Sequence, residues 1–167
     1  MASAVVLRPA TPTDIDRVYA WANDPVTRAV SFSHAEIPYS EHLAWFEQQL
    51  ERQDRNLMIA SLWPIDGSGE QPIAAVRLDR WLPARAEICV ISINVAPEAR
   101  GRGFGVATLE AARVVAGRLG FTAIHALIRP DNHASVRAFT RAGYVQDLEF
   151  NPPRPEQPAL RFIRALE

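Results

Sequence analysis

A glycine-rich turn between a strand pattern and a helix pattern is the feature that most constrains this sequence. Residues 86–95 are apolar and rich in β-branched side chains, residues 100–105 read Arg-Gly-Arg-Gly-Phe-Gly, and residues 106–119 have a helical pattern. Glycines allow a ligand to approach the backbone closely, and the first turn of a helix presents unpaired N–H groups. Guanidinium groups in the same turn favour phosphate. The turn therefore predicts a site for a phosphorylated ligand.

Three phosphate-binding patterns can be compared with this turn. A P-loop requires a lysine, and the chain contains none. The dinucleotide pattern Gly-x-Gly-x-x-Gly has a different spacing and occurs early in a βαβ unit, whereas this turn lies past the middle of the chain. The pattern Arg/Gln-x-x-Gly-x-Gly/Ala is matched by Arg100, Gly103 and Gly105.

A second motif follows after one predicted helix and one predicted strand. It consists of Asn132, Ser135 and Phe139 in an amphipathic run, which ends at Gly143 and Tyr144. Glycine suits the left-handed position after a helix. The two motifs together resemble the GCN5-related N-acetyltransferase (GNAT) superfamily, in which the first motif is the pyrophosphate loop for acetyl-CoA and the second helix lies along the CoA arm.

This resemblance implies an α/β (α+β) fold, the acyl-CoA N-acyltransferase fold, with a mixed, mostly antiparallel sheet flanked by helices in the order βααβββαβαββ. The patterns along the chain agree with that order, and residues 1–167 are expected to form one domain. Strands are predicted at residues 4–7, 56–63, 72–78, 86–95, 122–128, 145–150 and 160–166, and helices at 11–22, 40–50, 106–119 and 136–142. Residues 26–38 are predicted to be a loop or irregular helix, and Ser40 to cap the next helix.

Composition excludes several classes of function. The net charge of −1 argues against a nucleic-acid partner. No signal pattern or apolar run of membrane-spanning length is present, so a cytoplasmic protein without a membrane partner is expected. Cys89 is the only cysteine and lies in an apolar run, which predicts a buried thiol and no metal site.

The resemblance also implies a cofactor site. The central strand would part from its neighbour, so that free backbone groups bind the pantetheine arm of acetyl-CoA and one N–H stabilises the oxyanion. The cofactor-binding residues expected on this basis are Ile93, Asn94, Val95, Arg100, Gly101, Arg102, Gly103, Phe104, Gly105, Val106, Asn132, Ser135 and Phe139.

Two residues are candidates for proton transfer. Glu87 begins the central strand at the spacing at which histone-type members of the superfamily carry a glutamate base; the alternatives are an ion pair with Arg85 or a base made of water. Phe139 stands where the superfamily usually has a tyrosine acid. Tyr144 or a water would then serve as the acid, or none is needed; the alternative for Tyr144 is a core position.

The N-terminal half resembles aminosugar N-acetyltransferases of the pseudaminic acid pathway, which acetylate a UDP-linked 4-amino-dideoxy sugar. The acceptor-binding residues expected from this resemblance are Trp21, Asn23, Arg28, Glu41, His42 and Arg77. The aromatic side chains could instead be helix core. Alternative functions are a ribosomal-protein or peptide N-terminal acetyltransferase and a non-catalytic acyl-CoA-binding sensor. The expected partner is a small-molecule amine, and the chain is expected to be a monomer or a homodimer.

Overall fold

One sheet of seven strands, in the order β1-β2-β3-β4-β5-β7-β6, forms the frame of the protein. The computed structural model describes residues 4–52, 55–64, 67–81, 87–154 and 156–166. The strands are β1 (Val5–Pro9), β2 (Arg55–Leu62), β3 (Gln71–Arg80), β4 (Ile88–Val95), β5 (Ala123–Ile128), β6 (Val145–Asp147) and β7 (Leu160–Ala165). Among the strands of the described residues, only the β4–β5 pair is parallel, which confirms the mixed, mostly antiparallel sheet that the sequence predicted.

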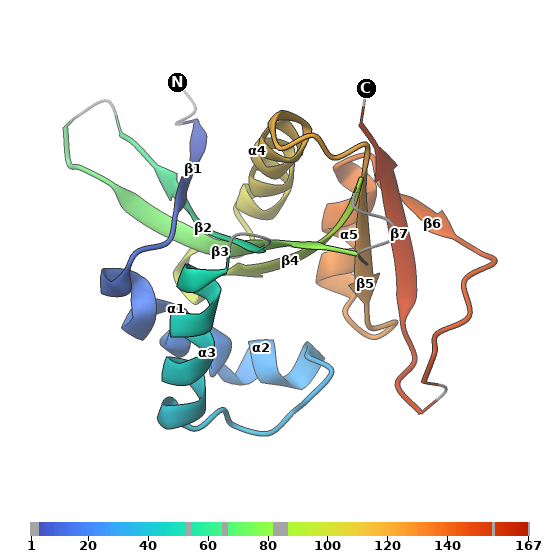
Figure 1. Cartoon of the computed structure of the whole chain (residues 1–167), viewed down its shortest axis with the longest axis horizontal. Helices are drawn as coiled ribbons and strands as arrows, with labels where there is room; N and C mark the ends of the chain where they lie inside the picture. Colours follow the sequence, from blue (N-terminus) through green and yellow to red (C-terminus); the bar gives the residue numbers. More distant parts are fainter. Residues whose placement is uncertain (1–3, 53–54, 65–66, 82–86, 155, 167) are drawn as a thin grey trace.

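Helices cover both faces of this sheet (Figure 1). They are the 3₁₀ turns η1 (Pro12–Asp14) and η3 (Pro97–Ala99) and the helices α1 (Ile15–Ala22), α2 (Pro25–Val30), α3 (Tyr39–Glu51), α4 (Phe104–Arg118) and α5 (His133–Arg141). Helices α1, α2 and α3 lie on one side of strands β2 to β4, and α4 lies on the other. Helix α5 lies beside β5.

Helix α2 is the main departure from the predicted order, because it falls in the segment expected to be a loop or irregular helix. The Asp24 carboxylate accepts a hydrogen bond from the Thr27 N–H at 3.0 Å, and Pro25 occupies the first helical position. A capping side chain followed by proline is a start signal for a helix. The observed order is therefore βαααβββαβαββ.

Several element boundaries also differ from the predicted ones. Helix α3 begins at Tyr39 after Pro38, so Ser40 lies inside the helix and does not cap it. Strand β6 ends at Asp147, whereas the apolar pattern predicted a strand to residue 150. Ala86, the predicted first residue of the central strand, lies outside the described residues.

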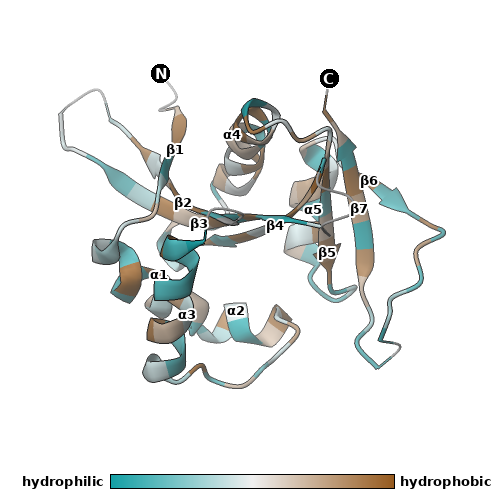
Figure 2. Cartoon of the chain, viewed as in Figure 1, coloured by the Kyte–Doolittle hydropathy of each residue, from teal (hydrophilic) through white to brown (hydrophobic). Residues whose placement is uncertain are grey.

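The hydrophobic core lies where α4 packs on the sheet. Leu109, Ala112 and Ala116 of α4 are fully buried, and strands β4 and β5 carry largely hydrophobic residues (Figure 2). Cys89 is buried on β4, and burial raises the pKa of its thiol to about 12. The prediction of a buried thiol is therefore confirmed, and its raised pKa makes it a poor nucleophile.

A buried carboxylate ties β1 to the start of α1. Both Asp14 oxygens accept hydrogen bonds from the Arg8 guanidinium, at 2.7 and 2.9 Å, and Arg17 lies 2.5 Å from one of them. The Thr11 N–H donates to the same carboxylate at 2.9 Å. Burial alone would raise the pKa of Asp14, but the hydrogen bonds from Arg8 and Thr11 outweigh it and lower the pKa to about 2.

Asp14→Asn is expected to lower the free energy of unfolding by about 3 kcal/mol at pH 7, because it leaves Arg8 without its buried partner. The folded-state pKa lies below the unfolded value of about 3.9, so the stabilisation is present above pH ~4 and is lost as the pH falls toward 2. Denaturant unfolding should therefore show the difference between variant and wild type shrinking over that range. Exposed Asp16, substituted by Asn, is the control. A difference that is independent of pH would contradict this account.

Candidate functional site

Strand β4 parts from β5 after Val90, as the sequence resemblance implied. Only Ile88, Cys89 and Val90 pair with β5. The Glu87 carbonyl accepts from the Thr122 N–H on the β5 side, and the Ala96 N–H donates to β3 on the other side. Because backbone groups alternate along a strand, the N–H and C=O groups of Ile91 and Ile93 face the gap between β4 and β5.

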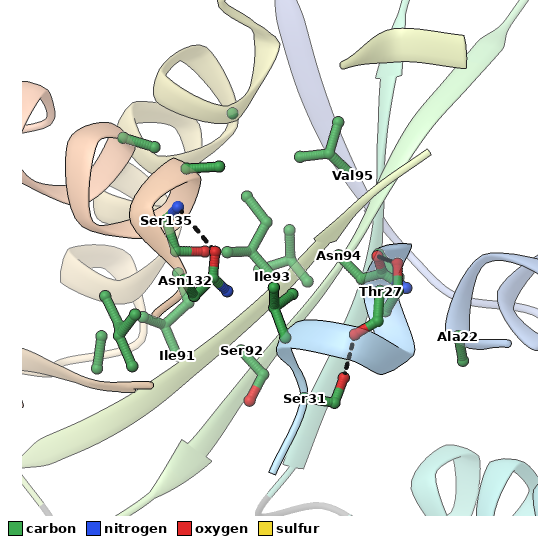
Figure 3. Close-up of a pocket in the computed structure, with 18 of the residues that line it drawn as sticks. Ala22, Thr27, Ser31, Ile91, Ser92, Ile93, Asn94, Val95, Asn132 and Ser135 are labelled. Carbon is green, nitrogen blue, oxygen red and sulfur yellow. Dashed lines mark hydrogen bonds between the residues drawn. The ribbon is translucent and has the colours of Figure 1, made fainter. Parts of the chain in front are cut away.

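A cavity of about 1,080 Å³ occupies this gap and extends to residues of α1, α2 and α3, and Figure 3 shows part of its lining. Its cofactor side consists of the C-terminal half of β4, the turn before α4, and α5. Its acceptor side consists of α1, α2, α3, the segment after α2, and β3. The acceptor side is largely apolar, and its apolar residues include Val26, Val30, Phe32, Ile37 and Trp45.

The turn before α4 has the geometry expected of an anion site. Gly101 and Gly103 have φ angles of +72° and +81°, in the left-handed region that other residues rarely adopt. Gly103 is the N-terminal cap of α4, and its carbonyl accepts the first helical bond from the Ala107 N–H. The N–H groups of Phe104, Gly105 and Val106 therefore precede the first helical bond and have no partner within the helix.

Most of the expected cofactor residues line the cavity. They are Ile93, Asn94, Val95, Arg100, Gly101, Gly103, Gly105, Val106, Asn132, Ser135 and Phe139. Arg102 and Phe104 are outside the lining, and the Arg102 guanidinium stacks on the Phe104 ring at 4.8 Å. The backbone of Asn94 is directed to β3, so this residue offers the cavity only its side chain.

Arg100 does not point freely toward a phosphate, because each of its nitrogens is hydrogen-bonded within the protein. Nε donates to the Val95 carbonyl at 3.2 Å, one terminal nitrogen to Asp24 at 2.7 Å, and the other to the Thr27 hydroxyl at 2.8 Å. The Thr27 hydroxyl also lies 3.3 Å from the Asn94 side chain. Arg100 therefore fastens the cofactor turn to α2.

The start of α5 lies across the gap from β4. The Asn132 side chain accepts a hydrogen bond from the Ser135 N–H at 3.1 Å, and both residues line the cavity (Figure 3). Phe139 is 3% exposed and contacts Tyr144 edge-to-face, with 4.9 Å between ring centroids. Phe139 therefore contributes an apolar, buried side chain of α5 to the cavity lining.

The structure does not bring the two expected proton-transfer residues to the cavity. Glu87 is exposed and precedes β4, about 13 Å along the strand from Ile91 at the usual rise per residue. Tyr144 is buried, and its hydroxyl has no hydrogen-bond partner among the described residues. Burial raises the pKa of that hydroxyl. Neither residue is part of the cavity lining.

The expected acceptor residues divide into two groups. Arg28, Glu41, His42 and Arg77 line the cavity, whereas Trp21 and Asn23 do not. Trp21 is 6% exposed and belongs to the hydrophobic core, which is the alternative that the sequence left open for it.

Residues 31–37, here termed the strap, connect α2 to α3 and bound the acceptor side. Asn23 holds Ile37 through two hydrogen bonds, from its amide to the Ile37 carbonyl at 2.9 Å and from the Ile37 N–H to its oxygen at 2.8 Å. Arg129, at the end of β5, donates to the Ser31 carbonyl and to His34. Asn23 and Arg129 thus position the strap from opposite sides of the cavity.

His42 is the acceptor-side residue best suited to accept a proton. It is 2% exposed, and its Nε2 lies 2.9 Å from the Ile15 carbonyl. A carbonyl can only accept, so Nε2 carries the hydrogen and Nδ1 carries the lone pair. The rings of Tyr19, Trp45 and Phe46 surround it. Burial lowers the pKa of His42, with a smaller opposing effect from the bond to Ile15, so the ring is neutral at pH 7.

Several polar residues of the lining were missed from the sequence. Thr27, Ser31, Ser92, Arg129 and Asp131 all line the cavity. Asp24 before a proline was a signal for α2 and hence for Thr27. The contact between Arg129 and the strap joins segments far apart in the chain, and no local pattern indicates it.

Residues 4–145 match the acetyltransferase (GNAT) domain family. The chain belongs to this family. It is therefore an acetyl-CoA-dependent N-acetyltransferase, and acetyl-CoA is its cosubstrate. No curated protein matches the sequence.

Solved structures of low sequence identity share the fold. A domain from Methanocaldococcus jannaschii has a TM-score of 0.80 at 18% identity, covering 99% of this chain and 100% of that one. Spermidine N-acetyltransferase from Vibrio cholerae, solved with CoA and spermine, has 0.79 at 16%, covering 96% and 95%. An aminoglycoside acetyltransferase, solved with coenzyme A and kanamycin, has 0.78 at 19%, covering 97% and 95%.

Among the described residues, no helix is both long and apolar enough to span a bilayer. Over the same part of the chain, no cluster of three or more His, Cys, Asp or Glu side chains has the arrangement of a metal site.

Asn23→Ala is expected to loosen the strap without unfolding the protein, because it removes both hydrogen bonds to Ile37. Amide hydrogen exchange of residues 31–37 should quicken, and KM for the acceptor should rise by about threefold to tenfold while KM for acetyl-CoA stays unchanged. Exposed Asn151, substituted by Ala, is the control. Unaltered exchange in the strap would show that Asn23 does not hold it.

Proposed function

We propose that this enzyme acetylates the primary amine of a small molecule by direct attack of that amine on acetyl-CoA while both substrates are bound. The observation that carries the proposal is that one cavity is continuous from the free edge of β4 to the acceptor side, which residues of α2 and α3 line. A thioester held along β4 and an amine held against the strap would meet in this space, so no acetylated protein intermediate is needed. The enzyme needs acetyl-CoA, which the cytoplasm supplies, so the cytoplasm is the expected location.

Acetyl-CoA fits the cofactor side of the cavity. The turn at Gly101 and Gly103 offers N–H groups and no Cβ atoms to its pyrophosphate, and Arg100 stays fastened to α2. The free N–H and C=O groups of Ile91 and Ile93 suit the amides of the pantetheine arm, which would continue the sheet in place of β5. A free N–H of the same edge would stabilise the oxyanion.

Gly103→Asp is expected to weaken acetyl-CoA binding at least tenfold more than Gly103→Asn. Both side chains strain the left-handed backbone to a similar degree, and Asn and Asp tolerate it better than most residues. Only the Asp variant places a negative charge beside the pyrophosphate, which costs a charge-assisted interaction. Calorimetric titration with acetyl-CoA measures both. Equal affinities of the two variants for acetyl-CoA would show that the pyrophosphate does not bind at this turn.

In the proposed reaction, the amine nitrogen forms a bond to the thioester carbonyl carbon, and the C–S bond breaks with its electron pair on sulfur. His42 Nδ1 accepts the proton that the attacking nitrogen loses, because it is the lone-pair nitrogen of a buried, neutral imidazole on the acceptor side. The thiolate leaves as an anion or takes a proton from water, since Phe139 offers none. Glu87 could act as the base only if a conformational change brought the start of β4 to the cavity.

His42→Gln is expected to lower kcat by about 10²-fold and to remove the acidic limb of the pH–rate profile. In the wild type that limb should lie below pH 6.5, since burial lowers the pKa of His42 and protonation abolishes its lone pair. Gln retains a donor for the Ile15 carbonyl. Glu87→Gln should leave kcat and the profile unchanged. The reverse result, with Glu87→Gln losing the limb, would restore the base predicted from the sequence.

The acceptor predicted from the sequence, a UDP-linked 4-amino-dideoxy sugar, has partial support. Val30, Phe32 and Ile37 offer an apolar surface for a methyl-bearing sugar, and Arg28 offers a cation to its phosphates, whereas Arg77 already pairs with Asp79. Against it, Asn23 and Trp21 are used within the protein. The fold relatives solved with spermine or kanamycin show how varied acceptors are on this fold.

The test of the proposed function is thiol release from acetyl-CoA with UDP-4-amino-dideoxy sugars, free aminosugars, small amino acids and N-terminal peptides as acceptors. Turnover on a small amine supports the proposal, and confinement to the UDP sugars supports the finer prediction. Turnover on peptides alone would make the protein an N-terminal acetyltransferase. Binding of acetyl-CoA without any turnover would favour the sensor.

A further inference from the structure

The charges around the cavity are unequally compensated. Four of its lining arginines lie outside α5, namely Arg28, Arg77, Arg100 and Arg129. Three of them have a carboxylate partner: Arg77 with Asp79 at 2.7 Å, Arg100 with Asp24 at 2.7 Å and Arg129 with Asp131 at 2.5 Å. These three pairs contribute no net charge to the cavity.

Arg28 is the exception. Within the described part of the chain, no carboxylate lies within 4.0 Å of its guanidinium. Its terminal nitrogens donate to neutral acceptors of the strap, the carbonyls of Ser33 and Ala35 at 3.2 and 3.4 Å and the Ser31 hydroxyl at 3.0 Å. Its Nε is buried without a hydrogen-bond partner. Burial also lowers the pKa of Arg28, as expected for a charge without a counter-ion.

The acidic side chains of the lining are few. They are Glu41 and Asp131, and Asp131 already pairs with Arg129. Glu41 lies at the start of α3, is exposed, and forms no ion pair among the described residues. The acceptor side thus offers one carboxylate to an ammonium group, one uncompensated guanidinium to an anion, and an apolar surface between the strap and Trp45.

This arrangement carries a prediction about substrate charge that rests on the proposed function. A half-buried charge without a counter-ion is costly, so a ligand that supplies the anion gains free energy there. We propose that the acceptor is an amine that also carries an anionic group: Arg28 binds the anion, Glu41 attracts the ammonium, and an apolar body lies between them. Polyamines and aminoglycosides carry several ammonium groups and no anion, and this acceptor side disfavours them.

Three linear amines of equal chain length test the proposal: hexylamine, 6-aminohexanoate and 1,6-diaminohexane. They differ only in whether the far end is neutral, negative or positive. Binding to the CoA-loaded protein is measured by calorimetry, and acetylation by thiol release. The wild type is expected to prefer 6-aminohexanoate over hexylamine by about tenfold, the usual worth of a charge-assisted hydrogen bond, and to bind 1,6-diaminohexane most weakly.

Substitutions of Arg28 separate its charge from its contacts with the strap. Arg28→Gln should abolish the preference for 6-aminohexanoate and leave hexylamine within about threefold of wild type, whereas Arg28→Lys keeps the charge and should keep most of the preference. Arg118→Gln, an exposed arginine at the end of α4, makes the same change in net charge away from the cavity. If Arg28 had a purely structural role, Arg28→Gln and Arg28→Lys would each change the affinities for all three amines by the same factor.

The outcomes distinguish this inference from the proposed function. Tightest binding of 1,6-diaminohexane, equal binding of all three amines, or no detectable binding of 6-aminohexanoate would overturn the charge assignment. Acetylation of any of them would still support the proposed function in those cases. Preferential binding of 6-aminohexanoate without acetylation of any small amine would support the charge assignment and overturn the function.

Discussion

The loss of pairing between β4 and β5 after Val90 is the constraint on which the site depends. Backbone N–H and C=O groups that leave a sheet need other partners, and those of Ile91 and Ile93 face a cavity. If β4 and β5 paired along their whole length, the interior of the sheet would contain no free strand edge. The free edge is kept open by elements that pack on either side, with α5 beside β5 and α2 beneath β4. An extended amide chain of a ligand is the natural partner for such an edge.

Arginine chemistry holds the two halves of the cavity together. The chain has no lysine, and all 18 of its basic residues are arginines. Arg100 shows why this matters, since its planar fork reaches Val95, Asp24 and Thr27 in three directions. A single ammonium group cannot bridge a strand end, a helix cap and a hydroxyl in this way. Arg129 acts similarly between β5 and the strap. The position of α2 and the strap is therefore coupled to the cofactor turn.

The sequence predicted the sheet, its mixed character and the lining role of Gly101, Gly103 and Gly105, because these depend on local patterns and on backbone conformation. It did not predict where Asn23 and Arg100 would point. Both were assigned to ligands, and both are hydrogen-bonded within the protein to residues distant in sequence. Glu87 was proposed as the base from its spacing along the chain. Which part of β4 lines the cavity depends instead on where β4 stops pairing with β5, and the local sequence does not indicate that point.

The same contrast separates the two sides of the cavity. The cofactor side is defined by a turn, a helix start and a strand edge, whose geometry follows from a few residues in sequence. The acceptor side is defined by the strap, which α1, α2 and β5 position through side chains. A substitution of one such side chain is expected to move the strap or change its charge, and the contacts of Arg100 with α2 couple such a movement to the turn before α4. The three solved structures named above are 16% to 19% identical to this chain, and what they share with it is the fold. Arg28 belongs to this acceptor side: its guanidinium donates to the strap and has no carboxylate partner among the described residues.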